Sequence, residues 1–438
     1  MNSPDFATLA PLEPLIDQCV HCGFCLPACP SYLLLGQEMD SPRGRIYTMK
    51  AGVADRLSIT APLVQHFDTC LGCMACETAC PSGVRYAPLI EQTRAAIEHH
   101  HQRALGDRLF RGLLFRILPY PGRLRVLSLP LGLITFLRRI PGIFSLLPLR
   151  IRNLIALAPS VAQGAIWREV PERTPAQGAA RLRVGLVTGC VQRAFFGEVN
   201  EATVRTLAAE GCEVVAPRSQ GCCGALALHS GQEDDARAFA KALIATFERE
   251  NVDQVVVNAA GCGSSMKQYG ELLAHDPAWA ERARAFSAKV RDVTETLSGL
   301  EARAPRAALA IRVAYHDACH LAHAQGIRRE PRALLESIPG LTIVPLADPD
   351  LCCGSAGIFN LVQPEMAAEL GRRKMVSISG AKADIVATSN PGCILQIGAA
   401  ARATGQHADV YHVVQLLDWS ITGESKKLGI RRGSGTNS

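Results

Sequence analysis

The sequence predicts an α+β multidomain protein in which a helical domain precedes a duplicated α/β domain. A run of four cysteines followed by proline occurs twice within the first 81 residues, and helical patterns surround both runs. After residue 180, short apolar strands alternate with amphipathic helices, which is typical of a parallel sheet. Three cysteine landmarks in that second part recur at a nearly constant offset, which indicates a duplicated unit.

Composition limits the class of protein before any motif is considered. The chain has 438 residues, enough for about three domains, and its 48% hydrophobic and 20% charged residues are typical of a globular protein. No run of about eighteen uncharged apolar residues occurs, so we do not expect a membrane-spanning helix. The first ten residues lack a basic region followed by an apolar run. We therefore expect a cytoplasmic protein, and so large a number of cysteines, 17, indicates metal ligands and not disulfides.

Both cysteine runs have the spacing C-x2-C-x2-C-x3-C-P. This is the signature of bacterial two-cluster ferredoxins, in which three thiolates of one run bind one 4Fe-4S cluster and the fourth binds the other cluster. The proline after the fourth cysteine turns that thiolate away from its own run. We therefore predict two crossed ligand sets. The first set is Cys19, Cys22, Cys25 and Cys80, and the second set is Cys70, Cys73, Cys76 and Cys29.

Zinc is the alternative for these eight cysteines. Structural zinc sites usually draw on two separated C-x2-C pairs. Two runs of four closely spaced cysteines, each ending in Cys-Pro, fit that pattern badly. We therefore expect 4Fe-4S clusters.

The ferredoxin domain is expected to be helical, because the forty or so residues between the runs exceed what a minimal duplicated ferredoxin needs. It should span residues 1–105, with helices over residues 12–18, 40–50, 57–67 and 86–105. Ser41 and Pro42 predict a helix start, with serine as the N-cap. Arg43 and Arg45 are either a solvated helix face or charges that raise the reduction potential of a neighbouring cluster. The histidines at 99–101 predict a solvated helix end, because adjacent helical residues cannot chelate together.

Residues 106–180 combine apolar residues with prolines and arginines. Arg103 to Arg173 holds twelve arginines, no lysine and three acidic residues. Within residues 110–158 the longest stretch without a charge, 126–137, cannot span a bilayer. Such helices can lie in a membrane interface, or they can pack against a partner subunit or the protein's own second half. Nucleic-acid binding is disfavoured, because the interleaved residues are aliphatic and not aromatic. Residues 169–180 are expected to be a linker.

The second part of the chain predicts two copies of one α/β unit, over residues 181–305 and 306–438. Strands are expected at 182–188, 213–217 and 252–258, with a helix at 198–210. Cys319, Cys352 and Cys393 follow Cys190, Cys222 and Cys262 by 129, 130 and 131 residues. In each copy the first and last of these cysteines come directly after a predicted strand. The carboxyl ends of parallel strands gather ligands, so the thiols of one copy should converge there.

These repeats resemble the family built on a Cys…Cys-Cys-Gly…Cys pattern, which includes heterodisulfide reductase subunits and the iron–sulfur subunits of flavin dehydrogenases. With Ser41-Pro-Arg-Gly-Arg-Ile46 and Thr69-Cys-Leu-Gly-Cys-Met-Ala-Cys-Glu-Thr-Ala-Cys-Pro-Ser-Gly83, the chain resembles glycolate oxidase iron–sulfur subunits. The resemblance implies that a separate FAD-containing subunit oxidises glycolate, and that this chain carries the electrons to a quinone, at the inner face of the cytoplasmic membrane, or to another acceptor.

Other functions stay open. A second hypothesis keeps the enzyme class and changes the electron donor, as in a related lactate or glycerol 3-phosphate dehydrogenase or a heterodisulfide reductase-like complex. A redox-sensing binding module is a third hypothesis. We find no dinucleotide fingerprint with its downstream acid, so we expect no catalytic residue in this chain.

The repeats depart from the fuller family pattern, because Ser265 and Gln396 replace a fifth cysteine in the first and second copy. This makes a disulfide-cleaving activity doubtful. The remaining cysteines fit one further 4Fe-4S cluster per repeat, a zinc ion or no metal. They are Cys190, Cys222, Cys223 and Cys262 in the first copy, and Cys319, Cys352, Cys353 and Cys393 in the second. His316 and His320 are either donors to cluster sulfurs or part of a helix N-terminus. Cys212 is expected to be a small buried residue.

Overall fold

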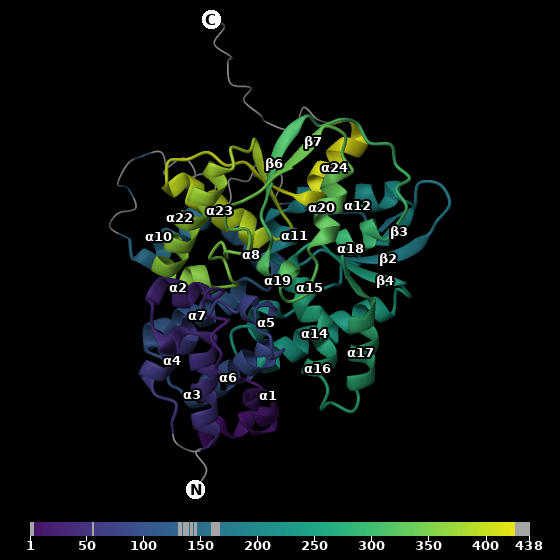
Figure 1. Cartoon of the computed structure of the whole chain (residues 1–438). Coiled ribbons are helices and arrows are strands. Elements are labelled where there is room, and N and C mark those ends of the chain that lie inside the picture. The colour runs from purple at the N-terminus through teal and green to yellow at the C-terminus, as the bar shows by residue number, and fades with distance from the viewer. Residues whose placement is uncertain are drawn as a thin grey trace, which may run out of the picture.

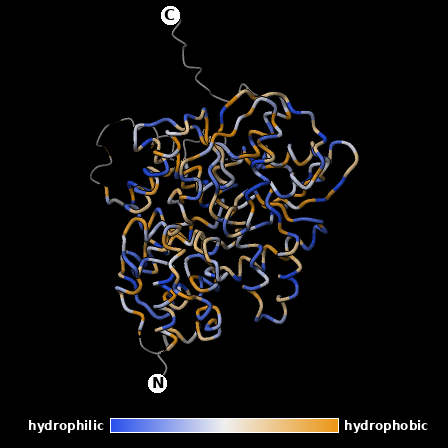
Figure 2. Tube along the Cα trace, in the orientation of Figure 1, coloured by the Kyte–Doolittle hydropathy of each residue, from blue (hydrophilic) through white to orange (hydrophobic). Residues whose placement is uncertain are grey.

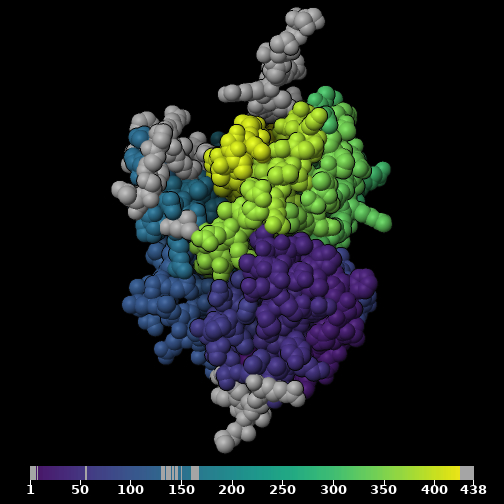
Figure 3. All heavy atoms as spheres, turned by 60° about the vertical axis from the view of Figure 1, so that its left-hand side comes forward, coloured from purple at the N-terminus to yellow at the C-terminus, as the bar shows by residue number. Residues whose placement is uncertain are grey.

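The computed structural model describes residues 4–54, 57–129, 147–158 and 167–424, together with positions 134, 140 and 143. Figure 1 shows the helical N-terminal domain in purple at one end of the molecule, with the two α/β units packed on it in teal, green and yellow. The space-filling view shows the same N-terminal domain directly beneath the second α/β unit (Figure 3). This arrangement confirms the predicted fold class: a ferredoxin-like helical domain followed by a duplicated α/β domain.

The N-terminal domain is built from short helices, because most of the chain between them is loop that carries the cysteines. They are η1 (Pro4–Leu12), α1 (Glu13–Asp17), α2 (Pro30–Leu35), η2 (Glu38–Asp40), α3 (Pro42–Val53), α4 (Ala61–Asp68), α5 (Ala75–Thr78) and α6 (Tyr86–His100). Their core includes Phe6, Leu9, Phe67, Leu89 and Ile90, each at most 1% exposed. The helix predicted over 86–105 ends at His100, and His99 and His100 are exposed there, as expected of a solvated helix end.

Helix α3 begins as its sequence predicts. The Ser41 side chain accepts a hydrogen bond from the backbone N–H of Gly44 at 3.0 Å, and Pro42 occupies the first helical position. Because Arg43 and Arg45 lie two positions apart in the first turn, they point to different sides of the helix. Helix α3 therefore presents one arginine on each of two sides.

The arginine-rich middle of the chain forms three helices in its described part: α7 (Leu105–Ile117), α8 (Pro121–Ser128) and α10 (Leu149–Leu157). Leu114 on α7 packs into an apolar cluster with Ile358 and Leu361 of the second α/β unit. Helix α7 therefore packs against the protein's own second half, which was one of the alternatives predicted for residues 106–180. Leu105, Leu109 and Leu113 lie on the other side of α7 and are exposed. Part of the uncharged stretch 126–137 lies outside the described residues.

Within the described residues, no helix combines the length and the apolar character that crossing a membrane requires. Figure 2 agrees with this along the coloured part of the trace, where hydrophobic stretches are short and alternate with hydrophilic ones.

Two parallel sheets form the second part. The first sheet contains β1 (Arg173–Thr174), β2 (Leu182–Val187), β3 (Cys212–Val215), β4 (Gln254–Val257) and β5 (Val290–Asp292), in the order β1-β3-β2-β4-β5. The second contains β6 (Ile311–Tyr315), β7 (Leu341–Val344), β8 (Ile385–Thr388) and β9 (Val410–His412), in the order β7-β6-β8-β9. The orders β3-β2-β4-β5 and β7-β6-β8-β9 match, so the duplication seen in the cysteines is also a duplication of topology. Only β1 runs antiparallel. It pairs with β3 at Arg173–Thr174, so the predicted linker over 169–180 contains a short edge strand.

Helices cover both sheets. In the first unit they are α11 (Val191–Phe195), α12 (Gly197–Ala209), α13 (Ala225–Leu228), α14 (Glu233–Glu248), α15 (Ala260–Lys267), α16 (Tyr269–Leu272), α17 (Ala280–Lys289) and α18 (Val293–Ser298). In the second they are α19 (Cys319–Ala322), α20 (Arg329–Glu336), α21 (Phe359–Val362), α22 (Pro364–Gly380), α23 (Pro391–Ala403) and α24 (Val413–Thr422). One apolar core contains residues of both sheets, including Val184, Val256, Val313 and Ile385. The two units therefore pack as one body.

Candidate metal centres and the junction between them

The first thiol group lies at the surface of the N-terminal domain, where the loop between α1 and α2 meets the residue Cys80 that follows α5. This group is Cys19, Cys22, Cys25 and Cys80, and all four line one surface pocket together with Cys76. Burial raises the pKa of Cys19, and the neighbouring thiols of Cys80 and Cys22 raise it further. Gly23 has φ +88°, and a Cβ there would lie 2.8 Å from a guanidinium nitrogen of Arg43, so this tight turn requires glycine. The fold thus brings the last cysteine of the second run to the first run.

The second thiol group lies deeper. This group is Cys70, Cys73, Cys76 and Cys29. Burial raises the pKa of Cys76 well above its ordinary value, and the thiols of Cys73, Cys70 and Cys29 raise it further. Burial has the same effect on the pKa of Cys73. Cys29 is therefore near the second run and not only near its own run. This proximity is what the crossed pattern requires.

Arg45 lies beside the second thiol group and is fully buried. Its Nη2 donates to Ser31 Oγ at 3.1 Å and to Thr69 Oγ1 at 2.9 Å, and its Nε donates to the His66 carbonyl at 2.7 Å. Asp40 lies 3.6 Å away as its ion-pair partner. The other terminal nitrogen, Nη1, has no hydrogen-bond partner among the described residues. A buried guanidinium with a free donor suits a site where an anionic cluster is held.

The charge of Arg45 affects the neighbouring thiols. Burial alone would raise the pKa of Cys70, but the guanidinium groups of Arg45 and Arg94 lower it, and the net result lies below the ordinary value. Arg43, on the other side of α3, is near the first thiol group, where its charge lowers the pKa of Cys19. Arg43 is partly exposed and pairs with Glu38 at 2.6 Å. Each of the two ferredoxin thiol groups therefore has one arginine of α3 beside it. Of these two arginines, only Arg45 is shielded from water.

Both groups suit a 4Fe-4S cluster in donor chemistry. Each has four thiols brought together by loops. Burial and the neighbouring thiols raise the pKa of Cys19 and Cys25 in the first group and of Cys73 and Cys76 in the second. A cluster supplies iron that binds thiolates, which removes the repulsion between them. The backbone N–H of Gly72 donates to Cys70 Sγ at 3.4 Å, a contact of the kind that supports cluster sulfurs.

The third thiol group belongs to the first α/β unit. This group is Cys190, Cys222, Cys223 and Cys262. The Sγ atoms of Cys190 and Cys222 are 3.5 Å apart, and the backbone N–H of Gly224 donates to Cys222 Sγ at 3.4 Å. The thiols of Cys222 and Cys262 both interact with Cys223, and its pKa lies well above the ordinary value. The four thiols therefore converge at the carboxyl edge of the sheet, as predicted from the strand positions.

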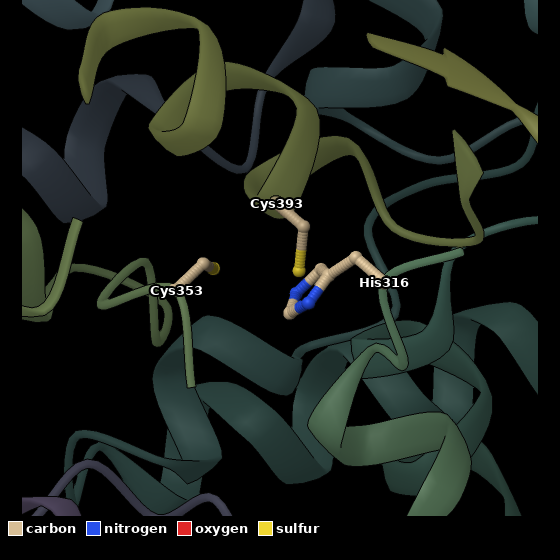
Figure 4. A group of neighbouring side chains, drawn as sticks. All are labelled: His316, Cys353 and Cys393. Atoms are coloured by element: carbon tan, nitrogen blue, oxygen red, sulfur yellow. The ribbon is translucent and has the colours of Figure 1, made fainter. Parts of the chain in front are cut away.

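The fourth thiol group belongs to the second unit. This group is Cys319, Cys352, Cys353 and Cys393. Cys352 interacts with Cys319 and with Cys353, and Cys353 interacts with Cys393, so the thiols form a connected series. Asn390 donates to Cys393 Sγ at 3.6 Å. Figure 4 shows the imidazole of His316 lying against Cys393, with Cys353 on the facing loop.

Two buried titratable side chains, His316 and Lys374, lie near the fourth thiol group. Burial and the positive charge of Lys374 lower the pKa of His316 well below its ordinary value, so the imidazole is neutral. Lys374 is fully buried, and its Nζ donates to the carbonyl of Asp348 at 2.7 Å. Burial lowers the pKa of Lys374, although the nearby thiols of Cys353, Cys352 and Cys393 act in the opposite direction. Sequence reasoning missed Lys374, because nothing in the local pattern of α22 distinguishes a buried lysine from an exposed one.

The fourth thiol group lies near the second one. Cys73 and Cys352 belong to one apolar cluster with Leu71, Phe359 and Leu370. The charge of Cys319 contributes to the raised pKa of Cys73, and that of Cys73 contributes to the raised pKa of Cys352. The deeper ferredoxin site is therefore adjacent to the cysteines of the second unit.

His229 of the first α/β unit and Arg94 of helix α6 lie at the same junction. The rings of His229 and His320 stack with centroids 4.9 Å apart. Arg94 donates to the carbonyl of His229 at 2.7 Å and to that of Cys70 at 2.5 Å. Sequence reasoning missed Arg94 and His229, because their partners are far away along the chain. Cys212 lies on β3 and is fully buried, and burial raises its pKa to about 11, so it is the small core residue that was expected.

Comparisons with known proteins agree with this organisation. Residues 15–84 match the model of a 4Fe-4S dicluster domain, and residues 184–267 and 313–398 each match the model of a cysteine-rich domain. The probable glycolate oxidase iron–sulfur subunit of Bacillus subtilis (strain 168) is 39% identical over 389 residues, which cover 86% of this chain and 87% of the relative.

Two further relatives extend the comparison. The glycolate oxidase iron–sulfur subunit of Escherichia coli (strain K12) is 33% identical and covers 90% of this chain and 93% of its own length. Lactate utilization protein A of Exiguobacterium sp. is 33% identical over 54% of this chain and 98% of its own length. The two cysteine runs, the duplicated cysteine-rich units and these end-to-end similarities lead to one conclusion: the chain belongs to the family of glycolate oxidase iron–sulfur subunits.

Proposed function

We propose that this chain is the electron-transfer subunit of a glycolate-oxidising complex. A partner subunit that holds FAD oxidises the substrate, and this chain takes the two electrons one at a time and passes them to a quinone or another acceptor. The observation that carries the proposal is the contact between thiol groups: the deep ferredoxin group at Cys73 adjoins the second cysteine-rich unit at Cys319 and Cys352.

The proposed ligand sets follow the crossed pattern. One 4Fe-4S cluster would be held by the first thiol group and a second by the second thiol group. The chain's own contribution is to hold the thiols in place and to supply charge: Arg45 is buried beside the second group, and Arg43 lies partly exposed beside the first. A buried positive charge stabilises an added electron more than a solvated one does. The first site is therefore the entry point and the second is the more oxidising one.

The third and fourth thiol groups are proposed as further metal centres. Each has four thiols at the carboxyl edge of its sheet. The fourth group adjoins the second ferredoxin group, because Cys352 and Cys73 belong to one apolar cluster. A metal bound by the fourth group would therefore lie next to the deep ferredoxin site.

Peripheral attachment at the inner face of the cytoplasmic membrane is part of the proposal. Leu105, Leu109 and Leu113 form an exposed apolar face on α7, and arginines lie between them and along the helices that follow. An arginine-bearing amphipathic helix of this kind can rest in the headgroup region of a membrane.

The experiment is metal analysis and spectroscopy on the complex purified without oxygen. Two 4Fe-4S clusters require at least about eight irons per chain, with matching acid-labile sulfide and EPR signals after reduction. Glycolate added to the complex with its flavin partner should reduce these clusters. Fewer than about eight irons would contradict the cluster assignment. Reduction by lactate or glycerol 3-phosphate but not by glycolate would keep the electron-transfer role and change the donor, and the similarity to lactate utilization protein A makes lactate the first alternative to test. No reduction by any flavin partner would favour a redox sensor.

A further inference from the structure

His316 carries a buried imidazole ring that makes no hydrogen bond within the part of the chain that the structure describes. It follows strand β6 directly and is 1% exposed. Neither ring nitrogen has a hydrogen-bond partner among the described residues. A neutral imidazole carries one donor and one acceptor, and leaving both unpaired in the interior costs stability. The ring nitrogens of His316 are therefore available to bind a group that the described part of the chain does not contain.

The side chains next to His316 are metal ligands by chemistry. A ring nitrogen of His316 and the Sγ atoms of Cys353 and Cys393 all lie within 4.8 Å of one another, and all three residues are buried (Figure 4). They come from three separate segments: the end of β6, the Cys-Cys-Gly loop and the start of α23. Across the described ranges, no other three histidine, cysteine or acidic side chains form so compact a group.

The spacing suits a single ion. Zinc binds sulfur at about 2.3 Å and imidazole nitrogen at about 2.0–2.1 Å in a tetrahedron, which places neighbouring ligand atoms roughly 3.6–3.8 Å apart. A small movement of side chains brings the His316 group to this spacing. A 4Fe-4S cluster bonds each thiolate to a different iron and so spreads its ligands more widely. The ferredoxin thiols, which the sequence assigns to clusters, do not form a group of this compactness within the described part of the chain.

The first repeat provides an internal comparison. Cys190 corresponds to Cys319, so the position that corresponds to His316 is Val187. Val187 is also buried, and it packs in one apolar cluster with Cys190, Cys222 and Cys223. The two repeats therefore share the cysteines but differ in the imidazole. A mixed sulfur and nitrogen ligand set exists only in the second repeat.

We propose that His316, Cys353 and Cys393 bind one zinc ion, and that one of the two remaining thiols, Cys319 or Cys352, completes the tetrahedron. The other thiol then stays free beside Cys73 of the ferredoxin domain. This proposal specifies the metal centre proposed above for the second repeat, and it does not depend on the direction or the donor of electron transfer. Because zinc is not redox-active, the site would order the loop that packs on the ferredoxin domain instead of carrying electrons itself.

The test uses the full chain, purified without oxygen, with zinc and iron measured by mass spectrometry and the zinc environment measured by X-ray absorption. We expect about one zinc per chain with three sulfur ligands and one nitrogen ligand. His316→Ala should lose the zinc and keep the ferredoxin irons. His316→Cys should keep the zinc with four sulfur ligands, and this variant serves if His316→Ala does not fold. Cys262→Ser, in the first repeat, is the matched control and should keep the zinc and its nitrogen ligand.

Three results would overturn the proposal: iron instead of zinc in the second repeat, zinc that His316→Ala leaves unchanged, or a zinc spectrum without nitrogen. A low ferredoxin iron count in the same samples would contradict the cluster assignment separately, because iron and zinc are counted independently.

Discussion

The Nε2 atom of His320 lies 3.0 Å from the carbonyl oxygen of Gly72, and it is the donor because a carbonyl can only accept. Gly72 lies between two cysteines of the second ferredoxin run, and His320 directly follows the first cysteine of the second cysteine-rich repeat. A second bond at the same junction joins Thr78 Oγ1 and His323 Nδ1, 2.9 Å apart. The loop that carries the deep thiol group is therefore held by hydrogen bonds to the second cysteine-rich repeat.

Loss of the His320 bond should loosen this junction. A hydrogen bond of this kind contributes on the order of 1 kcal/mol. His320→Ala should therefore increase the equilibrium constant for local opening of residues 70–78 about fivefold. Hydrogen–deuterium exchange of the full chain measures this. His407→Ala is the control, because that side chain is 80% exposed and distant in sequence from the junction. Equal exchange of residues 70–78 in both variants would show that the bond does not hold the loop.

The crossed ligand sets predict which variants resemble one another. Cys80→Ser should disturb the same cluster as Cys22→Ser, and Cys29→Ser the same cluster as Cys73→Ser, because the last cysteine of each run lies beside the other run. EPR spectra of the four reduced variants test the pairing, and iron counts should fall in each. If Cys80→Ser instead matched Cys73→Ser, the ligands would be uncrossed.

Arg45 should raise the reduction potential of the deep cluster. A positive charge in a poorly screened interior stabilises the added electron, so Arg45→Met should lower that midpoint potential by on the order of 100 mV. Arg43→Gln should change the midpoint potential of the first cluster much less, because Arg43 is partly exposed and paired with Glu38. EPR-monitored redox titration measures both.

The Arg45 variant needs a stability control, because removing the arginine takes the guanidinium partner from the buried Asp40 carboxylate, which keeps its contacts with His66 and Thr69. The double variant Arg45→Met with Asp40→Asn removes both charges and should fold better while keeping part of the lowered potential. Equal shifts of midpoint potential in the Arg43 and Arg45 variants would show that burial of the arginine does not determine the size of its effect.

The exposed leucine face of α7 predicts binding to anionic lipid. Replacing Leu105, Leu109 and Leu113 together with serine should abolish flotation of the full chain with phosphatidylglycerol vesicles, since the apolar area drives insertion. Val376→Ser is the control, because Val376 is also exposed but lies on α22. No flotation of the unaltered chain would indicate that the face contacts a partner subunit instead.

Local pattern was sufficient for much of this molecule. The cysteine spacing predicted the two-cluster domain, and the constant offset predicted the duplication that the two sheets then displayed in the same strand order. Ser41 and Pro42 predicted the start of α3 correctly. These features depend on neighbouring residues or on regular repetition, and both are visible in one dimension. The predicted linker was partly wrong at Arg173 and Thr174, because an edge strand of two residues is stabilised by its partner β3 and not by its own sequence.

Residue spacing and repetition were enough to predict the family, the helical and α/β parts and the groups of thiols. The arrangement of those groups came from packing: Cys73 lies near Cys352, Arg45 is buried and Arg43 is partly exposed. The His316 ring has no hydrogen-bond partner among the described residues and lies next to Cys353 and Cys393. The physical reason is that burial, screening of charge and hydrogen-bond satisfaction depend on which distant segments pack together. Two arginines two positions apart look alike in the sequence, and only packing excludes water from one of them.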